Sequence, residues 1–393
     1  MNFKQNNIPD FTSSFPQGYN RNMEFIDISK KDAVNTALLE WFASAKRDLP
    51  FRTERDPYKI WISEIMAQQT RIDTLLSYFE RFTRLFPDVK ALDAASEDEV
   101  LKAWEGLGYY SRARNLKKAA SEIVGAGRFP ETAAELKKLP GIGPYTAGAV
   151  ASIAFGQKAA AVDGNVLRVM SRIYGSDRDI ADLKTRRLLE NEIEATMPEE
   201  TGDYNESLME LGALICSPKS PKCMICPVRD LCSACMEGLT EELPVKTAKK
   251  KPRVVRQRGY IVIRNGKLLL EKRPEGVLLT GMYGLPLIEN DSSDQDQKTA
   301  LANLSEGAET PPVLLGTSRH IFTHIIWETE VYLIQADQPD HKSNIDRPDR
   351  VAEDQTEFAD RIAAFSADQL DHLALPTAFK KMLALYDGFN SAD

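Results

Sequence analysis

The stretch LPGIGPYTAGAVASIAFGQKAAAVDGN, residues 139–165, determines how the first half of the chain folds. Its apolar spacing predicts two short helices, over residues 132–139 and 145–155, joined by a Pro-Gly-Ile-Gly-Pro turn. Gly141 and Gly143 permit positive φ angles and the close approach of another backbone. Amides at the start of the second helix would face outward, where they and the helix dipole favour a phosphate. A turn that only connects two helices is the alternative.

The end of the same stretch places a carboxylate at the start of another helix. Asp163 is followed by Gly164, Asn165 and an amphipathic run over residues 166–170. We expect the helix dipole and the first amides to hold this aspartate in its ionised form. A helix cap without a catalytic function is the alternative for an Asp before an apolar run.

The composition predicts two domains that differ in charge. A chain of 393 residues with 42% hydrophobic content can bury two cores. Residues 1–258 hold 38 basic and 36 acidic side chains, whereas residues 259–393 hold 12 and 22. Between them, residues 244–258 contain seven basic residues and no acidic one. This stretch is interpreted as a linker, which either lies along a polyanion or is simply solvated.

The sequence shows no signal for a membrane. No apolar run reaches the roughly 20 residues that span a bilayer, and the N-terminus lacks the hydrophobic region of a signal peptide. We therefore expect a soluble, cytoplasmic monomer, associated with the nucleoid if its source is a bacterium. Residues 1–28 are rich in Asn, Ser, Pro and Phe without regular spacing, which predicts a flexible N-terminal arm.

The hydrophobic spacing changes along the chain. From residue 32 to about 201 it is mostly helical, with breaks at proline and glycine. After Arg258, GYIVIRNGKLLLEKR predicts two strands around an Asn-Gly hairpin turn, and WETEVYLIQA predicts another strand. The predicted fold is multidomain: an all-α domain over residues 29–243, the basic linker over 244–258 and an α+β domain over 259–393.

Four of the five cysteines fall within 17 residues in the spacing C-x6-C-x2-C-x5-C, namely Cys216, Cys223, Cys226 and Cys232. Without a secretory signal, such a group favours metal binding over disulfides. Four thiolates suit either tetrahedral zinc or a [4Fe-4S] cluster, and ligand softness does not separate the two. Cys235 lies outside the spacing and is interpreted as a spare thiol.

Chemistry in the helical domain must do without histidine, because all four histidines lie after residue 259. Glu64 lies in KIWISEIMAQQT, among apolar residues of a helix that we expect to begin near Pro57. A buried carboxylate without a cationic partner has a raised pKa and can donate a proton near neutral pH. With an ionised Asp163, it would form the acid and anion pair of glycoside cleavage. A glutamate on the polar stripe of an amphipathic helix is the alternative.

The hairpin LPGIGPYTA, the VDGN that follows it and the cysteine spacing together resemble the endonuclease III superfamily of base excision DNA glycosylases. Within it, SEIMAQQTR at residues 63–71, WEGLGYYSRARNL at 104–116 and the second domain are similar to the MutY family, the adenine DNA glycosylases. The resemblance is strong over residues 32–258 and weak beyond. It implies a helix-hairpin-helix over residues 132–155 and a [4Fe-4S] cluster on the loop 216–232.

Carried over by position, the resemblance implies how the bond between base and sugar is hydrolysed. Glu64 would protonate N7 of adenine, and Asp163 would stabilise the cationic sugar or bond to it transiently. Tyr145 and Asn165 would border this aspartate. Relatives that also cleave the DNA strand carry a Schiff-base lysine where this chain has Tyr145, so we expect a monofunctional enzyme.

The other matched residues would bind the adenine, the DNA and the opposite lesion. Glu206 and Arg52 match the adenine pocket. Lys219, Lys222 and Arg229 of the cysteine loop would face phosphates. A polar QQT and an aromatic GYY suit wedging and stacking around a flipped base, although loop packing is the alternative. The DNA and lesion contacts implied by the resemblance are Gln69, Thr70, Leu107, Tyr109, Gly141, Gly143, Phe322, Thr323 and His324.

The second domain resembles the Nudix-like reader of 8-oxoguanine in this family. The REXXEE core of the Nudix box is missing from residues 276–310, so we expect lesion binding without pyrophosphate hydrolysis. The expected partner is double-stranded DNA with adenine opposite 8-oxoguanine or guanine. Three alternatives stay open: a bifunctional glycosylase and lyase, a non-catalytic redox-sensing DNA-binding protein, and a Nudix hydrolase.

Overall fold

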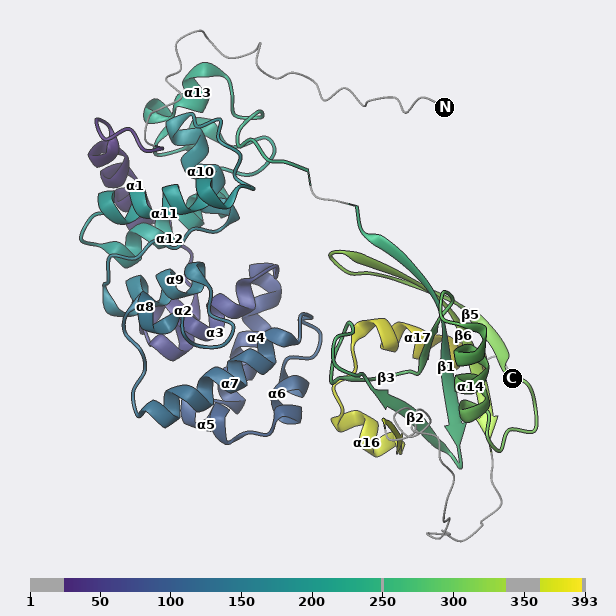
Figure 1. Ribbon diagram of the computed structural model, residues 1–393. Helices are drawn as coiled ribbons and strands as arrows, with labels where there is room; N and C mark the ends of the chain where they lie inside the picture. Colours follow the sequence, from purple (N-terminus) through teal and green to yellow (C-terminus); the bar gives the residue numbers. More distant parts are fainter. Residues whose placement is uncertain (1–24, 249–250, 337–360, 391–393) are drawn as a thin grey trace, which may run out of the picture. The chain divides into compact units, whose positions relative to one another are not determined.

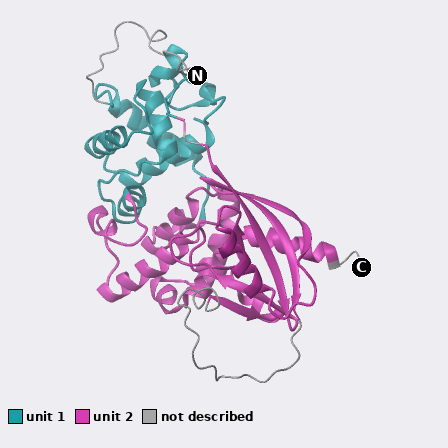
Figure 2. Cartoon of the chain, turned by 45° about the vertical axis from the view of Figure 1, so that its right-hand side comes forward, with its two compact units in different colours: residues 1–49, 144–247 teal, residues 50–143, 248–393 magenta. Residues whose placement is uncertain are grey.

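The computed structural model describes residues 25–248, 251–336 and 361–390 (Figure 1). The chain divides into two compact units. The first unit consists of residues 1–49 and 144–247, and the second unit of residues 50–143 and 248–393 (Figure 2).

The first unit is built around a buried helix. Its elements are α1 (Lys31–Ala45), α9 (Pro144–Phe155), α10 (Gly164–Tyr174), α11 (Leu183–Thr196), α12 (Thr201–Leu214), η2 (Cys223–Ile225), η3 (Arg229–Leu231) and α13 (Ser233–Glu237). Every residue of α10 from 166 to 174 is buried, and the helix ends at Gly175, which has a φ of 66°. Apolar residues of α10 form one core with α11, α12 and the first described residues of the chain.

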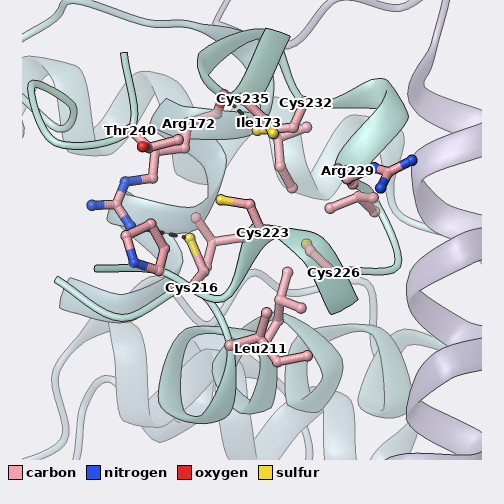
Figure 3. Close-up of a pocket in the computed structure, with 14 residues that line it drawn as sticks. Arg172, Ile173, Leu211, Cys216, Cys223, Cys226, Arg229, Cys232, Cys235 and Thr240 are labelled. Carbon is pink, nitrogen blue, oxygen red and sulfur yellow. Dashed lines mark hydrogen bonds between the residues drawn. The ribbon is translucent and has the colours of Figure 1, made fainter. Parts of the chain in front are cut away.

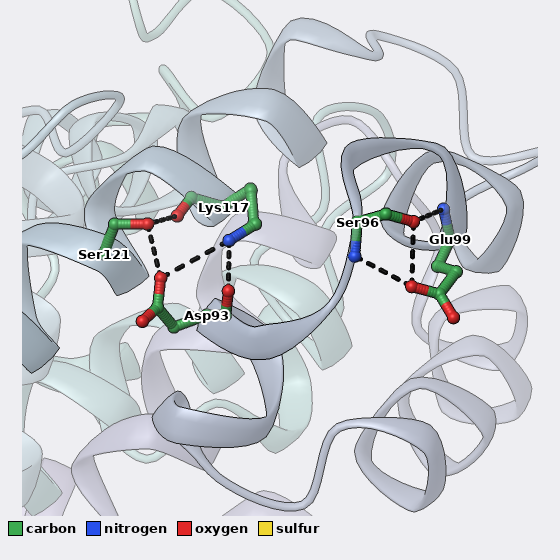
Figure 4. Close-up of polar contacts among 5 residues, drawn as sticks. All are labelled: Asp93, Ser96, Glu99, Lys117 and Ser121. Atoms are coloured by element: carbon green, nitrogen blue, oxygen red, sulfur yellow. Dashed lines mark hydrogen bonds and ion pairs between the residues drawn. The ribbon is translucent and has the colours of Figure 1, made fainter.

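The second unit begins with short helices, several of which are capped by their own side chains. They are α2 (Pro50–Thr53), α3 (Pro57–Ala67), α4 (Ile72–Leu85), α5 (Val89–Ala94), α6 (Glu97–Ala103), α7 (Ser111–Ala126) and α8 (Ala133–Leu136). Asp56 caps α3, which begins where the sequence predicted. Ser96 and Glu99 form a capping box at the start of α6 (Figure 4). Asp93 of α5 accepts a hydrogen bond from Ser121 of α7 at 2.5 Å, which joins these two helices.

The predicted helix-hairpin-helix is present, with a shorter first helix. Thr132 and Glu135 form a capping box at the start of α8. Gly141 has a φ of 75°, and a Cβ atom there would lie 2.6 Å from the Cβ of Asn115 on α7. Only glycine fits this turn without a shift of its neighbour. The second helix, α9, begins at Pro144 and is buried from residue 146 to residue 153.

The C-terminal part of the second unit is a seven-stranded mixed sheet. The strands are β1 (Arg253–Arg264), β2 (Lys267–Lys272), β3 (Tyr283–Gly284), β4 (Leu287–Glu289), β5 (Val313–Ile321), β6 (Ile325–Ala336) and β7 (Ile362–Phe365). The main strand order is β3-β2-β1-β6-β5. The predicted hairpin joins β1 and β2 through Asn265 and Gly266, which have φ angles of 50° and 71°. Strands β1 and β6 run parallel along their whole length.

A helix packs on each face of this sheet (Figure 1). Leu268 and Leu270 of β2 point to the core that contains Phe379 of α17 (Thr377–Asn390). Leu269, between them, points to the core that contains Leu304 of α14 (Asp294–Leu304). This is the alternation that a strand requires, and it confirms the α+β prediction. A short helix, α16 (Ala367–His372), precedes α17.

Strand β5 lies at the end of the main strand order and, among the described strands, pairs with β6 alone. Its register shifts between Leu314 and Gly316, which indicates a β-bulge.

Three expected boundaries differ from the structure. The linker expected over residues 244–258 includes the start of β1, which begins at Arg253 and pairs with β6. The arm expected over residues 1–28 includes Phe25 and Ile26, which are buried and whose amides donate to the Glu192 carboxylate at 2.8 and 2.6 Å. Residues 29–243 contribute to both compact units. Residues 1–24 and 249–250 lie outside the described part of the chain. None of the described helices combines the length and the apolar character of a membrane span.

Candidate active site

Asp163 caps the first turn of α10, as the sequence predicted. Its carboxylate accepts hydrogen bonds from the amides of Asn165 and Val166, both at 2.8 Å, and from Nδ2 of Asn165 at 2.9 Å. Burial nevertheless raises the pKa of Asp163 above its ordinary value of 3.8, although these hydrogen bonds act in the opposite direction. Loss of solvent thus acts against the ionisation that the helix amides favour, and the ionised state expected from the sequence stays a prediction.

Arg168 holds Asn165 from the other side. Its Nη2 donates to Oδ1 of Asn165 and to the carbonyl of Gly212, both at 2.9 Å, while its Nε donates to the carbonyl of Cys216 at 2.8 Å. Gly212 lies so close that a Cβ atom there would be 2.6 Å from the Cβ of Asn165. No function for Arg168 was predicted from the sequence, although an arginine inside an apolar helical run is a signal for a buried partner.

Two more predicted residues of the site lie in the first unit. Tyr145 is the second residue of α9, is half-buried and donates its hydroxyl to Sδ of Met209 at 3.1 Å. Glu206 is buried on α12, one helical turn before Glu210. The Glu210 carboxylate is also buried, and its Oε1 pairs with Nε of Arg47 at 2.7 Å.

Glu64 and Arg52 belong to the second unit. Glu64 is half-buried on α3, between the buried residues Ser63 and Ile65, which agrees with the predicted helix. Arg52 lies on α2. The expected acid and the expected anion, Glu64 and Asp163, thus come from different compact units.

Three of the predicted lesion contacts meet in the second unit. The hydroxyl of Tyr109 donates to Oε1 of Gln69 at 2.6 Å and shares a hydrogen bond with the hydroxyl of Thr323. Thr323 follows β5 and is exposed, as is His324. The loop before α7 and the loop between β5 and β6 are therefore in direct contact.

The other predicted contacts differ in how accessible they are. Leu107 is buried, so the exposed side chain of its turn is Tyr109. The ring of Phe322 packs at 5.0 Å from Trp327 and 4.5 Å from His320, between ring centroids. Phe322 is half-buried against the sheet core, and its contact with the lesion stays a prediction. Thr70 is half-buried, and Gly141 and Gly143 are exposed in the hairpin turn.

The predicted cysteine ligands surround one cavity of the first unit (Figure 3). Cys216, Cys223, Cys226 and Cys232 all line it, and Cys235 does so as well. Burial raises the pKa of Cys226 to about 12 and that of Cys232 to about 11. Among the described residues, no three His, Cys, Asp or Glu side chains are placed to hold a single metal ion. The four cysteine sulfurs instead lie around a cavity. This arrangement fits an iron-sulfur cluster, which is larger than a single metal ion and binds the cysteines in their deprotonated form.

A buried arginine lies beside these sulfurs. Nη1 of Arg172 donates to the carbonyl of Ser217 at 2.7 Å and lies 3.4 Å from Sγ of Cys216. Its Nη2 donates to the carbonyl of Pro218 at 3.0 Å and its Nε to that of Leu243 at 2.9 Å. Arg172 thus fixes the start of the cysteine loop and brings positive charge to the thiolates. No role for Arg172 was predicted from the sequence.

The basic residues of this loop differ in their surroundings. Lys219 and Lys222 are exposed. Arg229 is half-buried and pairs with Asp230, with 2.8 Å between Nε and Oδ1. The two lysines are therefore the stronger candidates for phosphate contacts.

Three segments of the chain match known protein families. Residues 62–195 match the HhH-GPD superfamily of base excision DNA repair proteins, residues 216–232 match the iron-sulfur binding domain of endonuclease III, and residues 259–385 match the NUDIX domain. These segments contain the hairpin, the cysteine loop and the C-terminal sheet.

Relatives of this chain are found in animals and fungi. The chain is 35% identical to the adenine DNA glycosylase of Mus musculus, over 80% of this chain and 73% of the relative. Its identity to the Homo sapiens protein is 34%, over 78% and 68%. Its identity to the Schizosaccharomyces pombe protein is 31%, over 88% and 85%. The chain therefore belongs to the adenine DNA glycosylase family, and it is a base excision DNA repair glycosylase with a [4Fe-4S] cluster.

Proposed function

We propose that this enzyme removes adenine mispaired with 8-oxoguanine or guanine from double-stranded DNA, and that it hydrolyses the N-glycosidic bond without cleaving the strand. The observation that carries the proposal is Asp163, fixed by three hydrogen bonds at the start of α10. The names of the relatives support adenine as the base.

Departure of the base requires a proton donor, because an adenine anion is a poor leaving group. Glu64, half-buried on α3, is this proton donor and protonates N7 of adenine. Glu206 and Arg52 bind the extruded base. Extrusion costs a few kcal/mol and is least costly at a mispair.

Asp163 stabilises the positive charge that develops on the sugar as the base departs. Both of its oxygens already accept hydrogen bonds, so the carboxylate does not have to reorient during the reaction. Asn165 keeps this orientation, and Arg168 in turn holds Asn165. Water completes the hydrolysis.

A hydrolytic enzyme without lyase activity follows from Tyr145. A phenol at this position forms no Schiff base with the sugar, whereas the lysine of bifunctional relatives does. The Tyr145 hydroxyl is also engaged by Met209.

The contact among Gln69, Tyr109 and Thr323 supports recognition of the opposite base. These side chains supply hydroxyl and amide groups, which can both donate and accept hydrogen bonds. Held by its four cysteines, the [4Fe-4S] cluster shapes the loop that carries Lys219 and Lys222, and it takes no part in hydrolysis.

The test is single-turnover base release from a duplex with one adenine opposite 8-oxoguanine, analysed with and without hot alkali. We expect strand breaks only after alkali. Asp163→Asn keeps the shape and loses the charge, so it should abolish release and still bind the duplex.

Other outcomes would point elsewhere. Breaks without alkali, together with trapping of the protein on DNA by borohydride, would establish the bifunctional alternative. Failure to release adenine from either mispair would refute the proposed substrate. Loss of binding in Asp163→Asn would mean that this residue is only a helix cap.

A further inference from the structure

Arg112 lies between two segments that carry the proposed contacts to the opposite base, all within the second unit. It is the second residue of α7. One segment follows the end of α3 and contains Gln69 and Thr70. The other precedes α7 and contains Leu107 and Tyr109.

The guanidinium of Arg112 donates hydrogen bonds to both segments. Its Nη1 lies 2.7 Å from the carbonyl oxygen of Ile65 and 2.8 Å from that of Gln68. Its Nη2 lies 3.2 Å from the carbonyl oxygens of Leu107 and Gly108. The last carbonyls of a helix have no hydrogen-bond donor within that helix, so Arg112 supplies donors at the end of α3. Its positive charge also interacts favourably with the negative end of the helix dipole. One planar group therefore sets the distance between the two segments.

Each segment contains a residue with a left-handed backbone. Gln69 has a φ of 61° and Tyr109 a φ of 49°. Residues other than glycine keep this conformation only where their surroundings impose it. The Tyr109 hydroxyl donates to Gln69, and the guanidinium carbon of Arg112 lies 5.5 Å from the centroid of the Tyr109 ring. Arg112 thus contacts the backbone next to Gln69 and the aromatic ring of Tyr109.

Arg112 is itself held by a buried aromatic ring. Its guanidinium carbon lies 5.2 Å from the centroid of Trp104, and the indole Nε1 of Trp104 donates to the carbonyl of Gly108 at 3.0 Å. Burial lowers the pKa of Arg112 to about 10, so the side chain still carries its charge at neutral pH.

We propose that Arg112 is a positioning residue that sets the enzyme's selectivity for the base opposite adenine, by holding Gln69 and Tyr109 at a fixed spacing. The inference rests on the proposed function, in which these two residues contact that base. Lysine does not replace arginine here, because one ammonium group cannot reproduce a planar fork that bonds to two segments.

The test compares Arg112→Lys and Arg112→Gln with the wild type on two duplexes, with adenine opposite 8-oxoguanine and opposite guanine. The single-turnover rate constant of adenine release is measured after titration of active sites, so that inactive protein does not affect it. We expect the ratio of the two rate constants to fall about tenfold in both variants, since each loses hydrogen bonds from a charged donor. Lys118→Met, an exposed change on the same helix, should keep the ratio.

The outcomes separate the inference from the function on which it rests. A wild-type ratio that persists in both Arg112 variants would overturn the inference alone. Equal losses on the two duplexes, with a lower melting temperature, would also overturn it, because Arg112 would then be purely structural. A wild type that releases no adenine would defeat the proposed function and the inference together.

Discussion

Ionisation of the Asp163 side chain is set by burial as much as by its hydrogen bonds. Its three hydrogen bonds favour the charged form, yet the pKa of Asp163 is raised because the residue is buried. In the proposed mechanism this carboxylate is negative during base departure, and its burial disfavours that ionised form. A low local dielectric also strengthens its attraction to a cationic sugar.

The pH dependence of base release should reveal this environment. Asp163 acts in its ionised form, so the rate constant should fall as the pH drops through the raised pKa, and the midpoint should lie above the ordinary value of 3.8. Asn165→Ala removes a hydrogen bond that lowers this pKa, so it should move the midpoint to a higher pH. The measurement is single-turnover release from acid to neutral pH, corrected for spontaneous depurination. An acid limb that does not move in Asn165→Ala would contradict the assignment.

Among the elements of the second unit, α6 and α17 are joined by one carboxylate. Glu105, just after α6, pairs with Lys380 of α17 at 2.9 Å and with Lys102 at 3.2 Å, and it accepts from the Leu375 amide at 2.9 Å. Lys102 also donates to the carbonyl of Leu373 at 3.0 Å. Burial opposes ionisation of Glu105, but these donors outweigh it and lower its pKa.

Glu105→Gln should therefore destabilise the second unit by roughly 2 kcal/mol at neutral pH, because two cations lose their partner. Since the pKa of Glu105 is lower in the folded chain, its contribution is present above the ordinary value of 4.5 and is lost as the pH falls through the folded value. Denaturant unfolding at neutral and acid pH measures both effects. Glu122→Gln, an exposed change on α7, is the matched control. A difference between variant and wild type that does not shrink in acid would count against this network.

Local elements were predictable and their long-range partners were not. The Asp163 cap, the start of α3 and the Asn265-Gly266 hairpin all follow from short patterns of residues. Arg112 and Arg168 were missed because they donate to backbone carbonyls, and a carbonyl leaves no mark in the sequence. Arg168 has one signal, a charged residue inside an apolar helical run, whereas Arg112 lies among polar residues at the start of α7 and has none.

The two compact units of the molecule do not follow the order of the chain. Residues 50–143 group with residues 248–393, and contacts such as that of Lys102 with Leu373 join positions 271 residues apart. The spacing of apolar residues depends on contacts within one helix or strand. It therefore separated helical from strand-rich segments, but it could not show which segments form one compact unit.

Cluster retention should depend on a residue outside the cysteine spacing. Arg172→Gln removes donors to the carbonyls of Ser217 and Pro218 and the charge near Cys216, so it should lower the iron content of the purified protein by about twofold or more. Iron analysis and the visible absorbance of the cluster measure this directly. Arg187→Gln, an exposed change on α11, should retain wild-type iron. An equal iron content in both variants would show that the cysteines alone are sufficient.

The bulge in β5 has a consequence for solubility. Val313, Leu314 and Ile321 are exposed on this outermost strand, with 46%, 54% and 59% of their surface accessible. A flat apolar edge would template the strand of another copy and start aggregation. The register shift between Leu314 and Gly316 interrupts the row of edge amides and carbonyls, and Arg319 adds charge to the same strand. We therefore expect the irregularity to hinder pairing of β5 with the same strand of another copy.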